Sequence, residues 1–234
     1  MNGEATRTLD LGGLLRGEHG ASLPWIRAEA PGAAAKALGI IALCGGGYGA
    51  SIGAWRGAEQ ALFCAIKLPL LLVLTALVCA ALNALWARRL GLDLSLAESV
   101  RAVLLEFAFA ALLLAAVAPV LALFDVTLPG PSEPRAWASH DLLGFAHVVA
   151  IAVAGSFALA RQRAWLRERC PHAPRARGLA VLWLAGHLVV CAQLSWSLRP
   201  WFGSPGLEVE FLRDRPLEGS FYESLIQMTL KRAH

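Results

Sequence analysis

Five polar side chains stand within otherwise apolar stretches of this sequence and are the first candidates for chemistry. They are Lys67, Glu106, His147, His187 and Gln193. Placing charged or hydrogen-bonding groups in hydrocarbon is costly, so ionisable residues in apolar segments commonly mark proton, ion or substrate paths. These residues are therefore candidates for a polar path within a membrane.

The two charged members of this set, Lys67 and Glu106, are not expected to form an ion pair. If their apolar stretches are antiparallel helices with a rise of about 1.5 Å per residue, roughly 16 Å separates them along the membrane normal. Pro69 suits the first turn of a helix, so a span beginning at Leu70 would leave Lys67 in an interfacial segment, with its amine reaching the headgroups. Glu106 likewise precedes a sufficient apolar run. We expect structural roles for both, with functional roles as the alternative.

The two histidines are single polar groups on apolar segments. No second histidine or carboxylate lies near His147 or His187 at the spacing of metal ligands on a helix. We expect each to hydrogen-bond a neighbouring helix, and lining a path together with Gln193 is the alternative. Cys170 and His172 are too sparse for a metal site.

The remaining sequence offers no recognisable reaction centre. The five cysteines contain no Cys-x-x-Cys pair, so neither a disulfide framework nor a metal or other cofactor is expected. The chain also contains no GxSxG, HExxH or P-loop motif and no recognisable catalytic triad. We therefore expect a non-enzymatic protein.

Small residues cover one side of the first apolar stretch. Gly45, Gly49 and Gly53 recur every four residues, which lets another helix backbone approach closely. The pattern predicts helix packing within a bundle, and self-association through this helix is the alternative. A phosphate-binding loop is remote, because no Lys-Ser or Lys-Thr pair follows the glycines.

Composition defines the elements that position these residues. Of 234 residues, 57% are hydrophobic and only 16% are charged, whereas soluble domains average about 45–50% apolar and about 25% charged residues. The excess is concentrated in blocks near the length of a membrane span. We predict an all-α polytopic membrane bundle of five helices, at about residues 37–54, 61–86, 95–124, 142–160 and 178–198.

The connections between these blocks carry start and stop signals. Ser95 and Glu98 have capping-box spacing, which predicts the start of the third helix. Prolines within residues 125–135 predict a loop before the fourth helix, and Pro171 and Pro174 prevent the basic stretch 161–177 from being one long helix. The chain then divides into an N-terminal arm (residues 1–36), expected to be loose, a five-helix domain (37–198) and a C-terminal tail (199–234).

The distribution of arginine predicts the orientation. Cytoplasmic loops are enriched in basic residues, and the stretch after the fourth span contains Arg161, Arg163, Arg167, Arg169, Arg175 and Arg177. We therefore place this stretch and the N-terminus in the cytoplasm of a bacterial inner membrane, and the C-terminus outside. The formal charge of +4 lies in such short segments, which argues against a nucleic-acid partner. Binding of anionic lipid headgroups is a second role for the arginines.

The C-terminal tail is too charged to be a sixth span. Ser220 and Glu223 have capping-box spacing and predict a short amphipathic helix, with Phe221, Leu225, Met228 and Thr229 near one face. We expect this helix to lie on the outer membrane surface or to fold over the mouth of the bundle.

The arm, the five closely spaced spans, the prolines at Pro69 and Pro119 and the capped LSLAESVRA segment together resemble the bacterial Yip1-like membrane proteins. The resemblance covers about residues 35–200 and is mainly architectural. It implies a five-helix domain of the kind that eukaryotes associate with membrane trafficking and small GTPases. The segments GGGYGASIG, IKLP and WSLRPWFGSP are similar to bacterial polytopic membrane proteins without an assigned activity. The charged tail departs from the Yip1 pattern, and no binding residues are carried over.

These observations favour a scaffold or organising component of the inner membrane, with the lipid bilayer and other membrane proteins as partners. The glycine face and the tail are its expected contact surfaces. A small transporter or channel subunit is the alternative, with the five intramembrane polar residues lining its path. A lipid-modifying membrane enzyme is a third and weaker reading, for which the sequence supplies no nucleophile and base.

Overall fold

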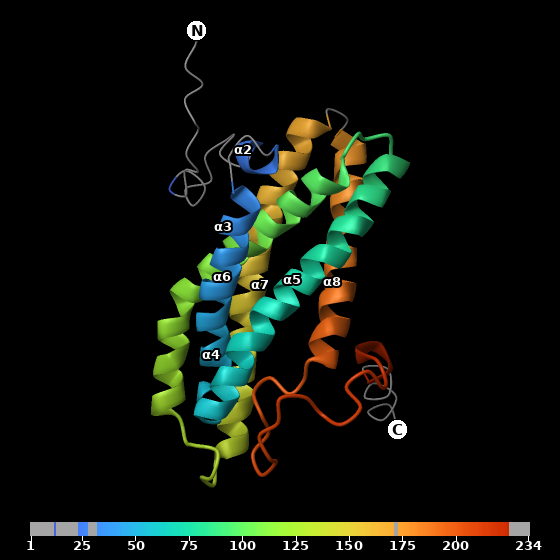
Figure 1. Ribbon diagram of the computed structural model, residues 1–234. Coiled ribbons are helices and arrows are strands. Elements are labelled where there is room, and N and C mark those ends of the chain that lie inside the picture. Colours follow the sequence, from blue (N-terminus) through green and yellow to red (C-terminus); the bar gives the residue numbers. More distant parts are fainter. Residues whose placement is uncertain (1–11, 13–22, 28–31, 171–172, 225–234) are drawn as a thin grey trace.

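Five long helical spans make up most of the described part of the protein, as the sequence predicts. The computed structural model describes residues 12, 23–27, 32–170 and 173–224, and within them it contains helices and no strand. Five helices are long and apolar enough to cross a membrane. They run along one another as an elongated bundle, with α2 near one end and the stretch after α8 near the other (Figure 1). The predicted all-α five-helix fold is confirmed.

The first span consists of three consecutive pieces, and each later span is one helix. A short helix precedes the first span at Leu23–Ile26 (α2). The elements of the five spans are Ala33–Ile40 (α3), the π-helix Ile41–Gly45 (η1) and Gly46–Ala54 (α4), then Ala58–Arg89 (α5), Leu96–Thr127 (α6), Ala136–Arg169 (α7) and Ala173–Ser197 (α8).

Helix α6 begins where its capping residues predict. The Ser95 side chain accepts a hydrogen bond from the Glu98 backbone N–H, and the Glu98 carboxylate accepts one from the Ser95 backbone N–H. This capping box satisfies two backbone donors that the helix itself cannot satisfy. The prediction from the Ser-x-x-Glu spacing is therefore confirmed.

Other helix ends differ from the prediction. The expectation that Pro69 lies in the first turn of its helix is wrong, because α5 starts at Ala58 and continues through Pro69. Helix α7 is also longer than predicted and carries the first four arginines of the basic stretch up to Arg169. Nothing in the sequence breaks a helix before Pro171, and polar residues at a span end are free to continue the helix into the aqueous phase.

The described part of the N-terminal arm is packed against the bundle. Trp25 and Ile26 of α2 are buried, and α2 contacts α6. The Arg101 Nε donates a hydrogen bond to the Ile26 carbonyl over 2.5 Å. The expectation of a loose arm is therefore wrong for these residues.

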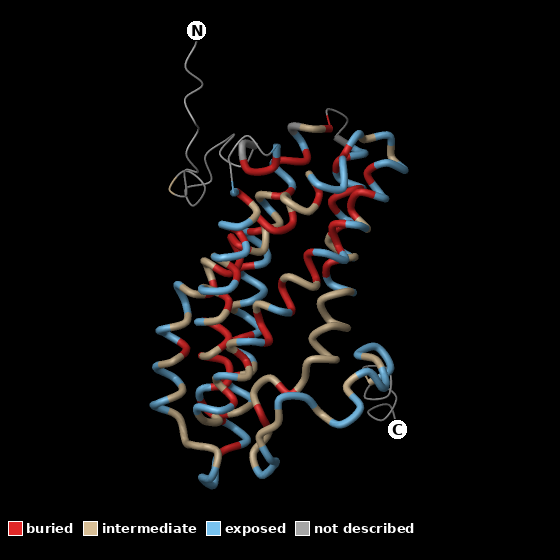
Figure 2. The backbone as a smooth tube through the Cα atoms, viewed as in Figure 1, coloured by how far each residue is buried: buried red, intermediate tan, exposed pale blue. Residues whose placement is uncertain are grey.

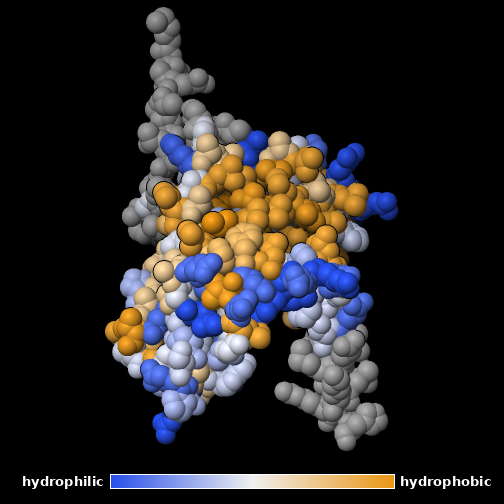
Figure 3. All heavy atoms as spheres, turned by 60° about the horizontal axis from the view of Figure 1, so that its bottom comes forward, coloured by the Kyte–Doolittle hydropathy of each residue, from blue (hydrophilic) through white to orange (hydrophobic). Residues whose placement is uncertain are grey.

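The outer surface of the bundle is apolar along its length. Large hydrophobic side chains such as Leu43, Val126 and Phe145 are highly exposed. Buried positions line the inner faces of the helices in Figure 2, and Figure 3 shows hydrophobic residues covering the bundle with hydrophilic residues gathered toward its end. Such a surface is unfavourable in water and matches the hydrocarbon of a bilayer.

The glycine face packs inside the bundle. A Cβ atom added at Gly49 would collide with the Cys64 carbonyl, and one added at Gly53 would collide with the Gln60 carbonyl. Gly45 lies against Leu72, where an added Cβ would be 3.5 Å from the Leu72 Cδ1. The glycines therefore let α4 approach the backbone of α5, the role that their spacing favours.

We expect Gly49→Leu to destabilise the bundle, because its side chain must displace the backbone of α5. Overpacking of this kind lowers the free energy of unfolding by roughly 1–3 kcal/mol. Gly47→Leu is the matched control, since a Cβ atom there meets nothing within 4 Å. Thermal unfolding in mild detergent, followed by tryptophan fluorescence, measures both. Equal stability of the two variants would contradict the packing role.

Candidate functional site

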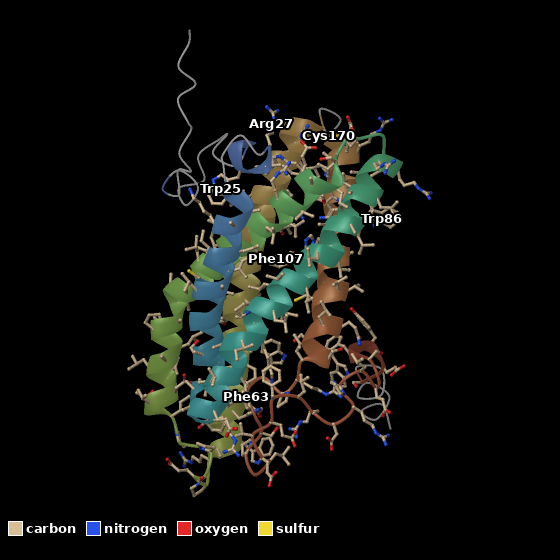
Figure 4. The ribbon with its side chains drawn as sticks, viewed as in Figure 1. Trp25, Arg27, Phe63, Trp86, Phe107 and Cys170 are labelled. Atoms are coloured by element: carbon tan, nitrogen blue, oxygen red, sulfur yellow. The ribbon has the colours of Figure 1, made fainter. Side chains whose placement is uncertain are left out.

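Three of the five candidate polar residues contact the stretch that follows α8. This stretch, residues 198–224, is called the C-terminal segment below. It folds back beside the lower ends of α5 and α7, and Phe63 of α5 lies next to it in Figure 4. The ring centroids of Phe63 and Phe211 are 5.2 Å apart in an edge-to-face arrangement.

Lys67 is the central anchor of the C-terminal segment. Its side chain is fully buried, and its Nζ donates a hydrogen bond to the Pro200 carbonyl over 2.8 Å. The same Nζ lies 5.0 Å from the centroid of the Phe211 ring, a cation–π distance. The expectation that Lys67 reaches the headgroups is therefore wrong, because the chain after α8 brings an acceptor to the amine.

Two further anchors on α5 were not singled out from the sequence. Gln60 donates from its Nε2 to the Trp201 carbonyl at 2.7 Å and to the Pro200 carbonyl at 3.2 Å. The Cys64 thiol donates to the Trp201 carbonyl at 2.8 Å. Gln60, Cys64 and Lys67 are spaced four and three residues apart, which places them on one helix face. That spacing was the available signal.

His147 and Gln193 also face this end of the bundle. The Nδ1 of His147 lies 3.0 Å from the Tyr48 hydroxyl, within hydrogen-bonding distance, and its ring lies 5.3 Å from the Phe202 ring. Tyr48 is on α4, so the prediction that His147 bonds a neighbouring helix is confirmed. The Gln193 Oε1 accepts a hydrogen bond from the backbone N–H of Phe221.

The other two candidates meet in a second cluster, where three helices converge. The Glu106 carboxylate of α6 accepts a hydrogen bond of 2.5 Å from the Nε2 of Gln162 on α7. The Nε2 of His187 on α8 is 3.9 Å from the same carboxylate oxygen. Phe107, beside Glu106, lies within the middle part of the bundle in Figure 4 and contacts the His187 ring. Sequence reasoning missed Gln162, since it stands among arginines.

The tautomer of His187 follows from its second contact. Its Nδ1 is 2.6 Å from the Trp183 carbonyl, which can only accept a hydrogen bond, so Nδ1 carries a proton. The Nε2 therefore presents a lone pair toward Glu106 when the ring is neutral. The carboxyl and the imidazole face each other just beyond hydrogen-bonding distance, and a cavity of about 20 Å³ adjoins Glu106 and Gln162. Neither Lys67 nor His147 lines that cavity.

The arginines of the basic stretch lie on two helices and have different surroundings. Arg169 forms an ion pair with Glu98 at the start of α6. The guanidinium of Arg161 lies over the Phe109 ring at 4.5 Å. Arg163, Arg167 and Arg177 surround a cavity between α7 and α8. Arg175 lines a different cavity, beside Asp93.

The second capping box is also present at the end of the C-terminal segment. The Ser220 backbone N–H donates to the Glu223 carboxylate, and the Glu223 backbone N–H donates to the Ser220 hydroxyl. Residues 221–224 form the first helical turn. The rest of the predicted amphipathic helix, including Leu225, Met228 and Thr229, lies outside the described residues.

In the part of the chain that the structure describes, side chains that can bind metals lie singly or in pairs. No group of three or more histidine, cysteine, aspartate or glutamate residues is placed there to hold a metal ion, and the five cysteines are free thiols. Comparisons with known proteins find no match: no family model fits the chain, and no curated protein or solved structure is detectably similar to it. The fold and these clusters define a polytopic α-helical membrane protein.

We expect Gln60→Leu to loosen the C-terminal segment, because the Pro200 and Trp201 carbonyls each lose a buried donor. Each of the two hydrogen bonds contributes about 1 kcal/mol, so the segment should open about thirtyfold more often. Limited trypsin digestion at Arg213 measures this opening, because Pro216 blocks cleavage after Arg215. Glu59→Gln, on the exposed side of the same turn, is the control. Indistinguishable cleavage of both variants would show that Gln60 does not hold the segment.

Proposed function

We propose that this protein is a non-enzymatic integral membrane scaffold that presents its C-terminal segment to a partner membrane protein. One observation carries the proposal: the fully buried amine of Lys67 is spent on holding the Pro200 carbonyl. A buried lysine whose amine is hydrogen-bonded to the main chain acts as a structural anchor. The C-terminal segment that it holds therefore has a fixed position against the bundle.

The exposed side of the C-terminal segment supports a contact role. Leu217 is 83% exposed and Leu207 is 47% exposed, although both lie on a segment fixed by buried hydrogen bonds. Arg56 adds a further anchor, with its Nη2 donating to the Leu207 carbonyl over 2.6 Å. Apolar side chains on a rigid, polar-rimmed surface are typical of protein contacts.

The concentration of arginines in the stretch 161–177 supports placing that stretch in the cytoplasm of a bacterium. The C-terminal segment would then lie on the extracytoplasmic side of the inner membrane, where a partner would bind. A five-helix architecture is what the resemblance to Yip1-like proteins implies. The proposal includes no small-GTPase partner, since the resemblance supplies no binding residues. Self-association through the first helix is less favoured, because Gly49 and Gly53 already face α5.

We expect a photo-reactive amino acid at Leu217 to cross-link one discrete membrane protein in intact cells. Lys67→Met should reduce that product several-fold, because the segment loses its anchor, whereas Lys36→Met, at an exposed position, should not. Mass spectrometry of the product identifies the partner. The scaffold proposal fails if Leu217 yields no specific product or if Lys67→Met leaves the product unchanged.

A second candidate, a proton-coupled transporter or channel subunit, is favoured by the Glu106 cluster alone. A carboxyl and an imidazole facing each other at 3.9 Å within a membrane bundle are typical components of proton relays. The remaining candidates do not extend this cluster, because Lys67, His147 and Gln193 have their partners nearer the C-terminal segment.

Proteoliposomes loaded with a pH-sensitive dye separate the two candidates. If the cluster conducts protons, the wild-type protein acidifies the interior faster than protein-free vesicles, and Glu106→Gln lowers the rate to that background. Asp141→Asn, on a carboxylate that is 80% exposed, should keep the wild-type rate. A wild-type rate equal to the background would exclude proton conduction by this cluster.

A further inference from the structure

A basic cavity lies between α7 and α8, at the end of the bundle opposite the C-terminal segment. It has a volume of about 310 Å³ and is lined by Arg163, Arg167, Ala176, Arg177, Ala180 and Val181. Small-ligand sites start at about 300 Å³, so the cavity has room for a lipid headgroup. None of the clusters that anchor the C-terminal segment or surround Glu106 contributes to it.

Three arginines line this cavity, and no described carboxylate lines it with them. Arg163 and Arg167 are four residues apart on α7 and share a face, and Arg177 approaches from α8. Among the side chains that the structure describes, no acidic group pairs with these three, whereas the nearby Arg169 is paired with Glu98. Three like charges repel one another, so an anion between them is stabilising.

The floor of the cavity is apolar and continues into the membrane-facing surface. Ala176 and Ala180 are buried beneath the arginines, and Val181 is half exposed. Leu188, two turns further along the same face of α8, is 62% exposed. A molecule with an anionic head and an apolar chain matches these two adjoining surfaces. Its head would contact the arginines, and its chain would lie along the apolar face of α8.

We infer that this cavity binds the phosphate headgroup of an anionic phospholipid from the leaflet at the arginine-bearing end. A topology signal requires only that basic residues lie on one side of the membrane. Convergence of Arg163, Arg167 and Arg177 on one cavity with an apolar floor is the additional feature that a headgroup site needs. Arginine is well suited to this role because its planar group donates two parallel hydrogen bonds to phosphate.

Lipid binding to the full-length protein tests the inference. The purified protein is placed in nanodiscs of phosphatidylcholine with increasing phosphatidylglycerol, and retained phosphatidylglycerol is measured by native mass spectrometry. The variant Arg163→Gln, Arg167→Gln, Arg177→Gln should bind it about a hundredfold more weakly, since each basic residue near an anionic surface contributes about fivefold.

The control variant Arg27→Gln, Arg88→Gln, Arg89→Gln removes the same charge from exposed positions outside the cavity and should retain wild-type binding. A second arm adds inorganic phosphate to phosphatidylcholine nanodiscs. The inference is overturned if both triple variants lose lipid equally, which would indicate general electrostatics. It is also overturned if free phosphate binds the wild-type protein as tightly as the lipid does, which would indicate a soluble anion site.

Discussion

The hydrogen bond from Lys67 to the Pro200 carbonyl is the constraint on which the position of the C-terminal segment depends. A buried amine within an apolar bundle has no water to solvate it, so the protein must supply an acceptor. The chain after α8 provides main-chain carbonyls, and Gln60 and Cys64 bind the same stretch from one face of α5. The same hydrogen bonds therefore satisfy these polar groups and fix the C-terminal segment.

These hydrogen bonds depend on the position of α5, which is set by the close approach of α4 and α5. Gly49 and Gly53 lie against the backbone of α5 at Cys64 and Gln60, the two residues that help to hold the segment on the other side of the helix. Van der Waals packing is the main force that joins helices in lipid. The glycine face thus positions the helix whose polar face anchors the segment, and it connects the membrane domain to the proposed contact surface.

The two ends of the bundle have different chemistry and serve separate proposals. The C-terminal segment offers a fixed surface with exposed leucines, whereas the opposite end offers a cavity bounded by Arg163, Arg167 and Arg177. Between them, Glu106 and His187 form a cluster whose partners come from three helices. A headgroup bound between α7 and α8 would secure the bundle at one leaflet without touching the surface at the other. The contact surface and the lipid cavity therefore function independently of each other.

Sequence alone determined the five apolar helices, the capping boxes at Ser95 and Ser220 and the glycine face, because each depends on residues close together in the chain. It also marked Lys67 and Glu106 as unusual. Their partners could not be predicted, since Pro200 is 133 residues from Lys67 and Gln162 is 56 residues from Glu106. Patterns among neighbouring residues do not determine which helices contact one another or where the C-terminal segment packs. Only tertiary packing decided that Lys67 is buried, because burial depends on an acceptor brought from elsewhere in the chain.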